Sequence, residues 1–233
     1  FVVPARLGWP LPIYELALMT AERAYAMNVE LAVTLVTPEE APLEIFGDGA
    51  SRAVAELLAE RRITIVTGAT CEVPDGRHVV IDPGGRRIEV DRVVALPELD
   101  GPAVRGLRAA DHGFIPVDSQ CRVSGLERVY AAGDATDFPI KQGGLGAQQA
   151  DTAARSIAAA CGLPVDPAPF APVLRGMLLT GGAPCYLSAR IVGGRPVESE
   201  VTDAPTWSPP TKIASRYLAP YLEERDRLSA GAR

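Results

Sequence analysis

The sequence predicts an α/β fold in which parallel strands alternate with helices and a short antiparallel meander is added. Strand and helix patterns alternate over residues 1–68, the order that builds a parallel sheet with right-handed crossovers. Turn-forming tripeptides then separate short β segments between residues 70 and 96. Finally, an apolar strand at residues 129–132 leads through Gly-Asp and a Gly-Gly turn into an Ala-rich helix.

Size and composition indicate a globular protein of one large or two small domains. The chain has 233 residues, of which 47% are hydrophobic and 22% are charged, and its net charge is -6. It therefore lacks the basic balance that nucleic-acid binding uses, and no nucleic-acid partner is expected. The sequence has no apolar run of about 18 residues and no signal-peptide pattern, so a cytoplasmic location is expected.

The cysteines and histidines do not predict a metal site. The four cysteines are far apart and form no C-x-x-C, which disfavours zinc and a local redox dithiol. Free buried thiols are the expected state of Cys71, Cys121, Cys161 and Cys185. His78 and His112 have no metal-ligand spacing and are expected to be structural or exposed.

The first 99 residues read as a Rossmann-like unit with an added meander. Apolar periodicity and turn signals predict three strands and two helices, namely strand 1–3, helix 13–27, strand 30–37, helix 51–61 and strand 63–68. Pro74-Asp75-Gly76 and Pro83-Gly84-Gly85 then suit tight turns, because Pro presets φ and Gly supplies φ > 0. An antiparallel meander across the parallel core is expected, with a crossing between domains at 96–107.

The first turn departs from a dinucleotide-binding pattern. Such a turn uses G-x-G-x-x-G so that bare backbone can approach a pyrophosphate. Here only Gly8 is present, and Trp9, Pro10 and Pro12 fill the space. The pattern favours a retained scaffold whose nucleotide site is altered, with ordinary NADH binding as the alternative.

Acidic residues near this unit's ligand edge match the dinucleotide pattern weakly. The second strand ends at Thr37 and Pro38, with Glu39 and Glu40 just beyond, where a ribose-binding acid would stand. Glu15 would approach a nicotinamide if one bound; otherwise it is a carboxylate on the helix surface.

The stretch VYAAGDATDFPIKQGGLGAQQADTAA at residues 129–154 carries the stronger signal. Its strand brings Gly133 and Asp134 to the carboxyl end, the edge where α/β sheets bind ligands. A carboxylate there can accept hydrogen bonds from a polyol such as a ribityl chain, or it can cap the following turn. The Gly143-Gly144 turn lets backbone approach a flat ring, and the helix at 145–161 directs its positive end toward it.

This stretch, with its lead-in GFIPVDSQCRVSGLERVYAAGD, resembles the second flavin-binding motif of the FAD-dependent pyridine nucleotide-disulfide oxidoreductase superfamily. The branch of type II NADH dehydrogenases and sulfide:quinone oxidoreductases is the most similar. The resemblance covers most of residues 1–165, and the late WSPPTKIASRYLAPYL is similar to a C-terminal element of such flavoproteins. It implies an NAD(P)-binding-like domain at 1–99, the second half of an FAD-binding domain at 100–165 and a C-terminal extension at 166–233.

The resemblance also implies site residues, with FAD as the cofactor and NAD(P)H as a second candidate. It assigns Asp134, next to Gly133, to the ribityl chain. Adjacent helix positions cannot both face one ligand, so at most one of the two glutamines contacts the flavin. The flavin edge would be lined by Lys141, Gln142 and Gly143, with Gln148 or Gln149 near the ring or the quinone side.

The sequence departs from the superfamily in three places. The first FAD motif is absent, so we expect that about half of the flavin domain lies before Phe1 as a missing N-terminal partner segment. The sulfide:quinone branch has Lys-Thr-Gly where this chain has Lys141-Gln142-Gly143. The cysteine pair of the sulfide-oxidising branch cannot be placed, since Cys185 is the only candidate in the C-terminal part.

An amphipathic final helix is expected over residues 213–227. Its apolar side would dock on the protein core or on a partner subunit, as in a homodimer, or would lie on a membrane surface to reach quinone. That side is formed by Ile213, Tyr217, Leu218, Tyr221 and Leu222.

The expected function is that of an FAD-dependent oxidoreductase that passes electrons to a quinone or another small acceptor, with a degenerate NAD(P)H site. One alternative is an NAD(P)H-dependent flavoprotein reductase that still uses the unusual turn. The other is a non-catalytic interaction module or an inactive fragment.

Overall fold

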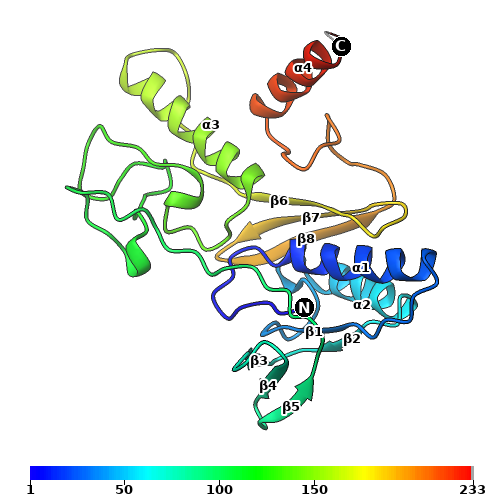
Figure 1. Ribbon diagram of the computed structural model, residues 1–233. Coiled ribbons are helices and arrows are strands. Elements are labelled where there is room, and N and C mark those ends of the chain that lie inside the picture. Colours follow the sequence, from blue (N-terminus) through cyan, green and yellow to red (C-terminus); the bar gives the residue numbers. More distant parts are fainter. Residues whose placement is uncertain (232–233) are drawn as a thin grey trace. The chain divides into compact units, whose positions relative to one another are not determined.

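The computed structural model describes residues 1–231 of the chain (Figure 1). Its helices and strands are α1 (Leu11–Ala26), β1 (Thr34–Val36), η1 (Glu44–Phe46), α2 (Asp48–Glu60), β2 (Thr64–Val66), β3 (Thr70–Glu72), β4 (His78–Asp82), β5 (Arg86–Glu89), η2 (Asp111–Gly113), η3 (Gly133–Ala135), α3 (Gly143–Ala160), β6 (Val173–Leu178), β7 (Cys185–Val192), β8 (Arg195–Thr202) and α4 (Leu218–Gly231).

The chain forms two compact units. The first unit comprises Phe1–Leu99, Gly176–Ala189 and Arg195–Ala204. The second unit comprises Asp100–Arg175, Arg190–Gly194 and Pro205–Arg233.

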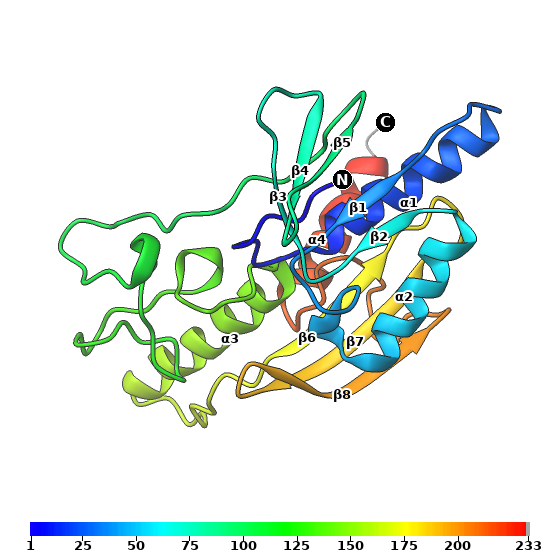
Figure 2. The same ribbon diagram turned by 90° about the horizontal axis from the view of Figure 1, so that it is seen from below.

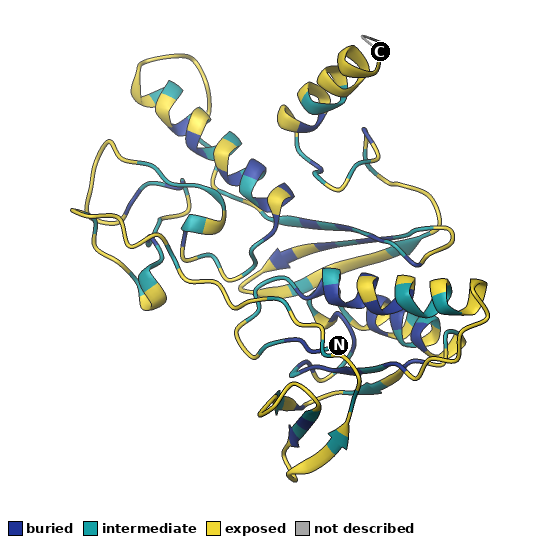
Figure 3. Ribbon diagram, viewed as in Figure 1, coloured by how far each residue is buried: buried dark blue, intermediate teal, exposed yellow. Residues whose placement is uncertain are grey.

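A parallel sheet lies in the first unit, as the alternating pattern predicted. β1 pairs in parallel with β2, and Val2 forms parallel bridges to Val36 and Ala95. The predicted strand 1–3 is thus reduced to one bridging residue, Val2, and the strands predicted at 30–37 and 63–68 are shortened to three residues each. Both predicted helices form as α1 and α2, and α1 presents one buried and one exposed side (Figure 3). The predicted α/β fold class is confirmed.

The meander is antiparallel, with strand order β3-β4-β5. Val79 and Ile81 of β4 pack with Val36 and Ala69 in one buried cluster, so the meander covers a face of the parallel sheet as expected. This apolar contact holds the meander in place.

A three-stranded sheet of order β6-β7-β8 follows α3 in the chain. The part of this sheet that belongs to the first unit packs closely against α1 and η1. A Cβ on Gly176 of β6 would lie 2.7 Å from Leu11 Cδ1 and Phe46 Cζ, so no side chain fits at this position. α2 contacts β8, as Figure 2 shows. β6 alternates buried and half-buried residues, as expected for a strand with one covered face.

The second unit is built around α3, with few regular strands. The predicted strand that leads into Gly133 is reduced to one bridge between Tyr130 and Arg122. α3 begins two residues earlier than the predicted helix. α4 begins at Leu218 instead of residue 213, because Pro220 has no N–H and is tolerated only in the first turn of a helix. Among residues 1–231, no helix is long and apolar enough to cross a bilayer.

Candidate functional site

Two glycines bring η3 and the first turn of α3 into backbone contact in the second unit. Gly133 has φ +78°, a conformation that side chains disfavour. A Cβ added to Gly146 would lie 3.0 Å from Gly133 Cα, so a side chain here would separate the two backbones. The contact places the Gly133-Asp134 step beside the start of α3, as the motif predicted. Asp134 itself is exposed.

Gln149 holds this step in position. Its Oε1 accepts a hydrogen bond from Gly133 N at 2.7 Å. Its Nε2 donates to Thr136 Oγ1 at 3.3 Å, and the same hydroxyl lies 3.4 Å from Gln149 Oε1. Thr136 Oγ1 also donates to Gly133 O at 2.8 Å. Thr136 is fully buried and Gln149 is 2% exposed, so these bonds form without competition from water. Gln149 is therefore a positioning residue for the Asp134 loop.

Replacing Gln149 by leucine is expected to destabilise the second unit by about 2 kcal/mol, because Gly133 N loses its acceptor inside the protein. Urea unfolding followed by circular dichroism measures the change. The matched variant Gln148→Leu should cost less, since Gln148 is only half-buried. Equal losses for the two variants would contradict the role assigned to Gln149.

Gln142 caps α3. Its Oε1 accepts from Leu145 N at 2.7 Å, and its Nε2 donates to Arg175 O at 3.2 Å. The side chain predicted to line a cofactor is thus 7% exposed and serves the helix start. Gly143 is exposed and its N–H has no intrahelical acceptor, which leaves this part of the positive end of the helix available to an anion.

Lys141 supplies a cation beside Asp134. Its Nζ lies 3.7 Å from the centroid of the Phe114 ring and donates to Thr136 O. Desolvation lowers the pKa of Lys141, while the nearby carboxylates of Asp134 and Asp137 partly oppose that shift. The ammonium group is therefore fixed in place, and not a freely moving surface charge.

The two adjacent glutamines diverge, as helix geometry required. Gln149 faces Gly133, whereas Gln148 binds the backbone of Val173, donating to its O at 2.9 Å and accepting from its N at 3.0 Å. Gln148 therefore joins α3 to the start of β6. The sequence did not reveal this bond, because the partner is a backbone group 25 residues away.

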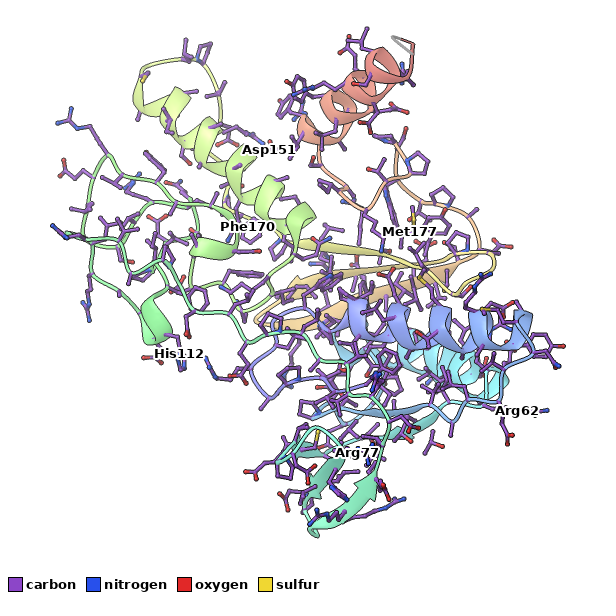
Figure 4. All side chains as sticks on the ribbon, viewed as in Figure 1. Arg62, Arg77, His112, Asp151, Phe170 and Met177 are labelled. Carbon is purple, nitrogen blue, oxygen red and sulfur yellow. The ribbon has the colours of Figure 1, made fainter. Side chains whose placement is uncertain are left out.

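A shallow cavity of about 360 Å³ lies between α3 and α4 in the second unit. Desolvation raises the pKa of Asp151, labelled in Figure 4, even though a backbone hydrogen bond from Arg216 opposes the shift. The cavity offers an apolar, partly aromatic surface with one carboxyl group. Its lining consists of Ala147, Ala150, Asp151, Tyr217, Leu218 and Tyr221.

The turn before α1 in the first unit presents little to a dinucleotide. Pro10 and Pro12 have no N–H, and Ile13 N donates to Pro10 O at 2.9 Å. Leu11 is only 2% exposed, so the start of α1 lacks accessible donors for a diphosphate. Trp9 lies against Phe46, with ring centroids 5.8 Å apart.

Glu15 has a structural contact in the first unit. It is 7% exposed, and its Oε1 accepts from Leu179 N at 2.9 Å. Glu15 is thus not a carboxylate on an exposed helix surface.

The four cysteines are free thiols as predicted, but of the four only Cys121 is buried, whereas Cys71 and Cys185 are half-buried and Cys161 is exposed. Burial raises the pKa of Cys71, Cys121 and Cys185, which lowers their thiolate fraction. Within the described residues, no group of three or more histidine, cysteine or acidic side chains could hold a metal ion.

Comparison with known proteins identifies the fold of the chain. The family model described as pyridine nucleotide-disulphide oxidoreductase matches residues 15–158, which is more than half of the chain. Three solved structures share the fold. They are a sulfide:quinone oxidoreductase from Aquifex aeolicus (TM-score 0.69, 18% identity), LpdA from Mycobacterium tuberculosis (0.55, 19%) and an NAD-dependent persulfide reductase from A. fulgidus (0.55, 20%).

The matches cover most of this chain but only part of those proteins. The covered shares of this chain are 87%, 81% and 82%, in the same order. The covered shares of the solved chains are 53%, 39% and 36%. This chain therefore spans about half the length of the sulfide:quinone oxidoreductase and less than half the length of the other two proteins.

Proposed function

Because the chain belongs to the pyridine nucleotide-disulphide oxidoreductase family, we propose that it forms part of an FAD-dependent oxidoreductase that passes electrons through the flavin to a quinone or another small acceptor. The observation that carries the proposal is the junction of η3 with the start of α3. There an exposed carboxylate, a fixed ammonium group and helix N–H groups are contributed by one short stretch of chain.

The residues present fit the polar parts of FAD. Asp134 is exposed and would accept hydrogen bonds from ribityl hydroxyls. A Cβ on Gly143 would meet only Ile213 Cγ1, at 3.8 Å, so backbone there is open to a flat ring. A bound flavin would supply the redox chemistry by accepting and passing on an electron pair.

The chain's own residues would favour negative charge near the start of α3. The helix dipole contributes positive potential there, and the ammonium group of Lys141 adds to it from its place over Phe114. Gln142 fixes the first turn of the helix, and Gln149 fixes the loop that carries Asp134. Gln142 thus orients the start of α3 and Gln149 orients the loop, while the positive charge of Lys141 would attract negative charge on the cofactor.

The NAD(P)H site is proposed to be degenerate. A diphosphate needs accessible backbone N–H groups, and the turn at Trp9–Pro12 combines two prolines with an indole ring that packs at a tilt against Phe46. Electrons would then come from a donor other than a pyridine nucleotide bound at this turn.

A complete flavin site is proposed to need a partner segment. The chain spans 53% of the sulfide:quinone oxidoreductase that it matches, and no G-x-G-x-x-G occurs in the sequence. We propose that a segment preceding Phe1, or a separate polypeptide, contributes the remaining flavin contacts. The exposed Tyr217 and Tyr221 of the cavity beside α3 would contact the acceptor or a membrane surface that holds it.

Asp134→Asn tests the site. In protein purified from its natural host with its partners, FAD affinity is expected to fall roughly 10- to 100-fold, because a charge-assisted hydrogen bond is weakened. Equilibrium dialysis with FAD measures the change. Asp166→Asn is the matched control, since Asp166 is exposed in a Pro-rich segment away from the motif, and its affinity should equal that of the wild type. Unchanged affinity in Asp134→Asn would remove Asp134 from the site.

A further inference from the structure

The buried side chain of Glu39 lies just beyond the C-terminal end of β1 in the first unit. Glu39 is 8% exposed, and its Oε2 accepts hydrogen bonds from the Tyr14 hydroxyl at 2.7 Å and the Thr37 hydroxyl at 2.9 Å. Tyr14 belongs to α1 and is fully buried. The carboxyl group therefore connects the helix to the end of the strand.

The backbone around Glu39 connects a third segment. Gly68 N donates to Glu39 O at 2.8 Å, and Ala69 N donates to Thr37 O at 2.9 Å. Gly68 and Ala69 follow β2 after one intervening residue, Thr67. α1, the end of β1 and the segment after β2 therefore meet at Glu39.

The surroundings suit a neutral carboxyl group better than a carboxylate. Glu39 Oε1 is buried, and it has no hydrogen-bond partner in the described part of the chain. Among residues 1–231, the ionisable groups that act on Glu39 are Tyr14 and Glu44, and neither is a cation. Burial, with a smaller contribution from the Glu44 charge, raises the pKa of Glu39 to about 7, against the opposing hydrogen bonds from Tyr14, from Thr37 and from the backbone of Glu44.

We propose that Glu39, Tyr14 and Thr37 form a proton-linked latch, which holds α1 to the segments after β1 and β2 while Glu39 is protonated and loosens when Glu39 ionises. A carboxylate buried without a cation is relieved by opening to water. The latch lies at the carboxyl edge of a parallel sheet, where α/β folds bind ligands, so its state would control access to that edge. The proposal does not depend on flavin binding.

The sign of the pH effect follows from the raised pKa. The folded-state pKa of Glu39 lies above the value of 4.5 that applies in the open state. The latch therefore contributes its full stability below pH 4.5 and loses it as pH rises through about 7.

Hydrogen–deuterium exchange of the full chain tests the latch. Amides of residues 37–47 and 67–70 are compared between the wild type and Glu39→Gln at matched pH, which cancels intrinsic exchange rates. Gln can accept both hydroxyl hydrogen bonds but does not ionise. From about pH 5 to about pH 8, wild-type protection should fall relative to Glu39→Gln by on the order of 50-fold.

Tyr14→Phe provides an independent readout. The Tyr14 hydroxyl lowers the pKa of Glu39, so its removal should move the loss of protection to higher pH. Glu40→Gln, at the exposed neighbouring carboxylate, should reproduce the wild-type profile. A protection ratio that stays constant with pH, or a shift to lower pH in Tyr14→Phe, would overturn the proposal. If Glu39→Gln does not fold, Tyr14→Phe alone decides.

Discussion

Replacing Gly101 by alanine is expected to destabilise the second unit by about 3 kcal/mol or more, the upper range for overpacking. A Cβ at Gly101 would lie 2.3 Å from Gly113 C and from Phe114 N. These are backbone atoms, so relief requires the two segments to separate. Separation would break the hydrogen bond from Gly101 N to His112 O and would displace Phe114 from Lys141. Urea unfolding followed by circular dichroism measures the loss.

Gly49→Ala is the matched control for this change. A Cβ at Gly49, in the first turn of α2, meets nothing within 4 Å. Alanine there should be neutral or stabilising by up to about 1 kcal/mol, because it favours helix. A Gly101→Ala variant as stable as Gly49→Ala would contradict the close approach of residues 101 and 113.

Replacing Gly146 by valine is expected to lower FAD affinity at least about tenfold in the protein with its partners, since about 1.4 kcal/mol corresponds to that factor. Even alanine would place Cβ 3.0 Å from Gly133 Cα, and the branched side chain needs more room. The Gly133-Asp134 step would move away from the start of α3. FAD titration of the purified variant measures the effect.

Ala154→Val introduces the same side chain at an exposed position of the same helix, outside the lining of the cavity beside α4. It should cost only helix propensity, about 0.5 kcal/mol, and leave FAD affinity unchanged. If both variants bind FAD as the wild type does, the backbone contact between η3 and α3 does not shape the site.

Much of the first unit follows from local patterns. The period of apolar residues located α1 and α2, and the turn residues Pro74–Gly76 and Pro83–Gly85 located the meander hairpins. β8 was not predicted from the sequence, because its exposed positions include charged side chains and its other residues are only partly buried. The two left-handed glycines at 193 and 194 are the turn signal that could have found it.

The site was predictable in outline but not in its internal bonds. Gly133, Asp134, Lys141 and Gly143 were recognisable because the motif is contiguous in sequence. The role of Glu39 could not be foreseen, because its partner Tyr14 lies 25 residues away on α1. Long-range contacts of buried polar groups depend on packing that no local pattern encodes.

Residues 133–149 are proposed to form part of an FAD site. To test this, the protein is purified from its natural host through a C-terminal tag, and the intact masses of the polypeptides and the visible spectrum are recorded together. The account predicts an oxidised-flavin absorbance that is stoichiometric with this chain, in a polypeptide longer than 233 residues or in a complex with a second one. A preparation without flavin, whatever the masses present, would contradict the claim.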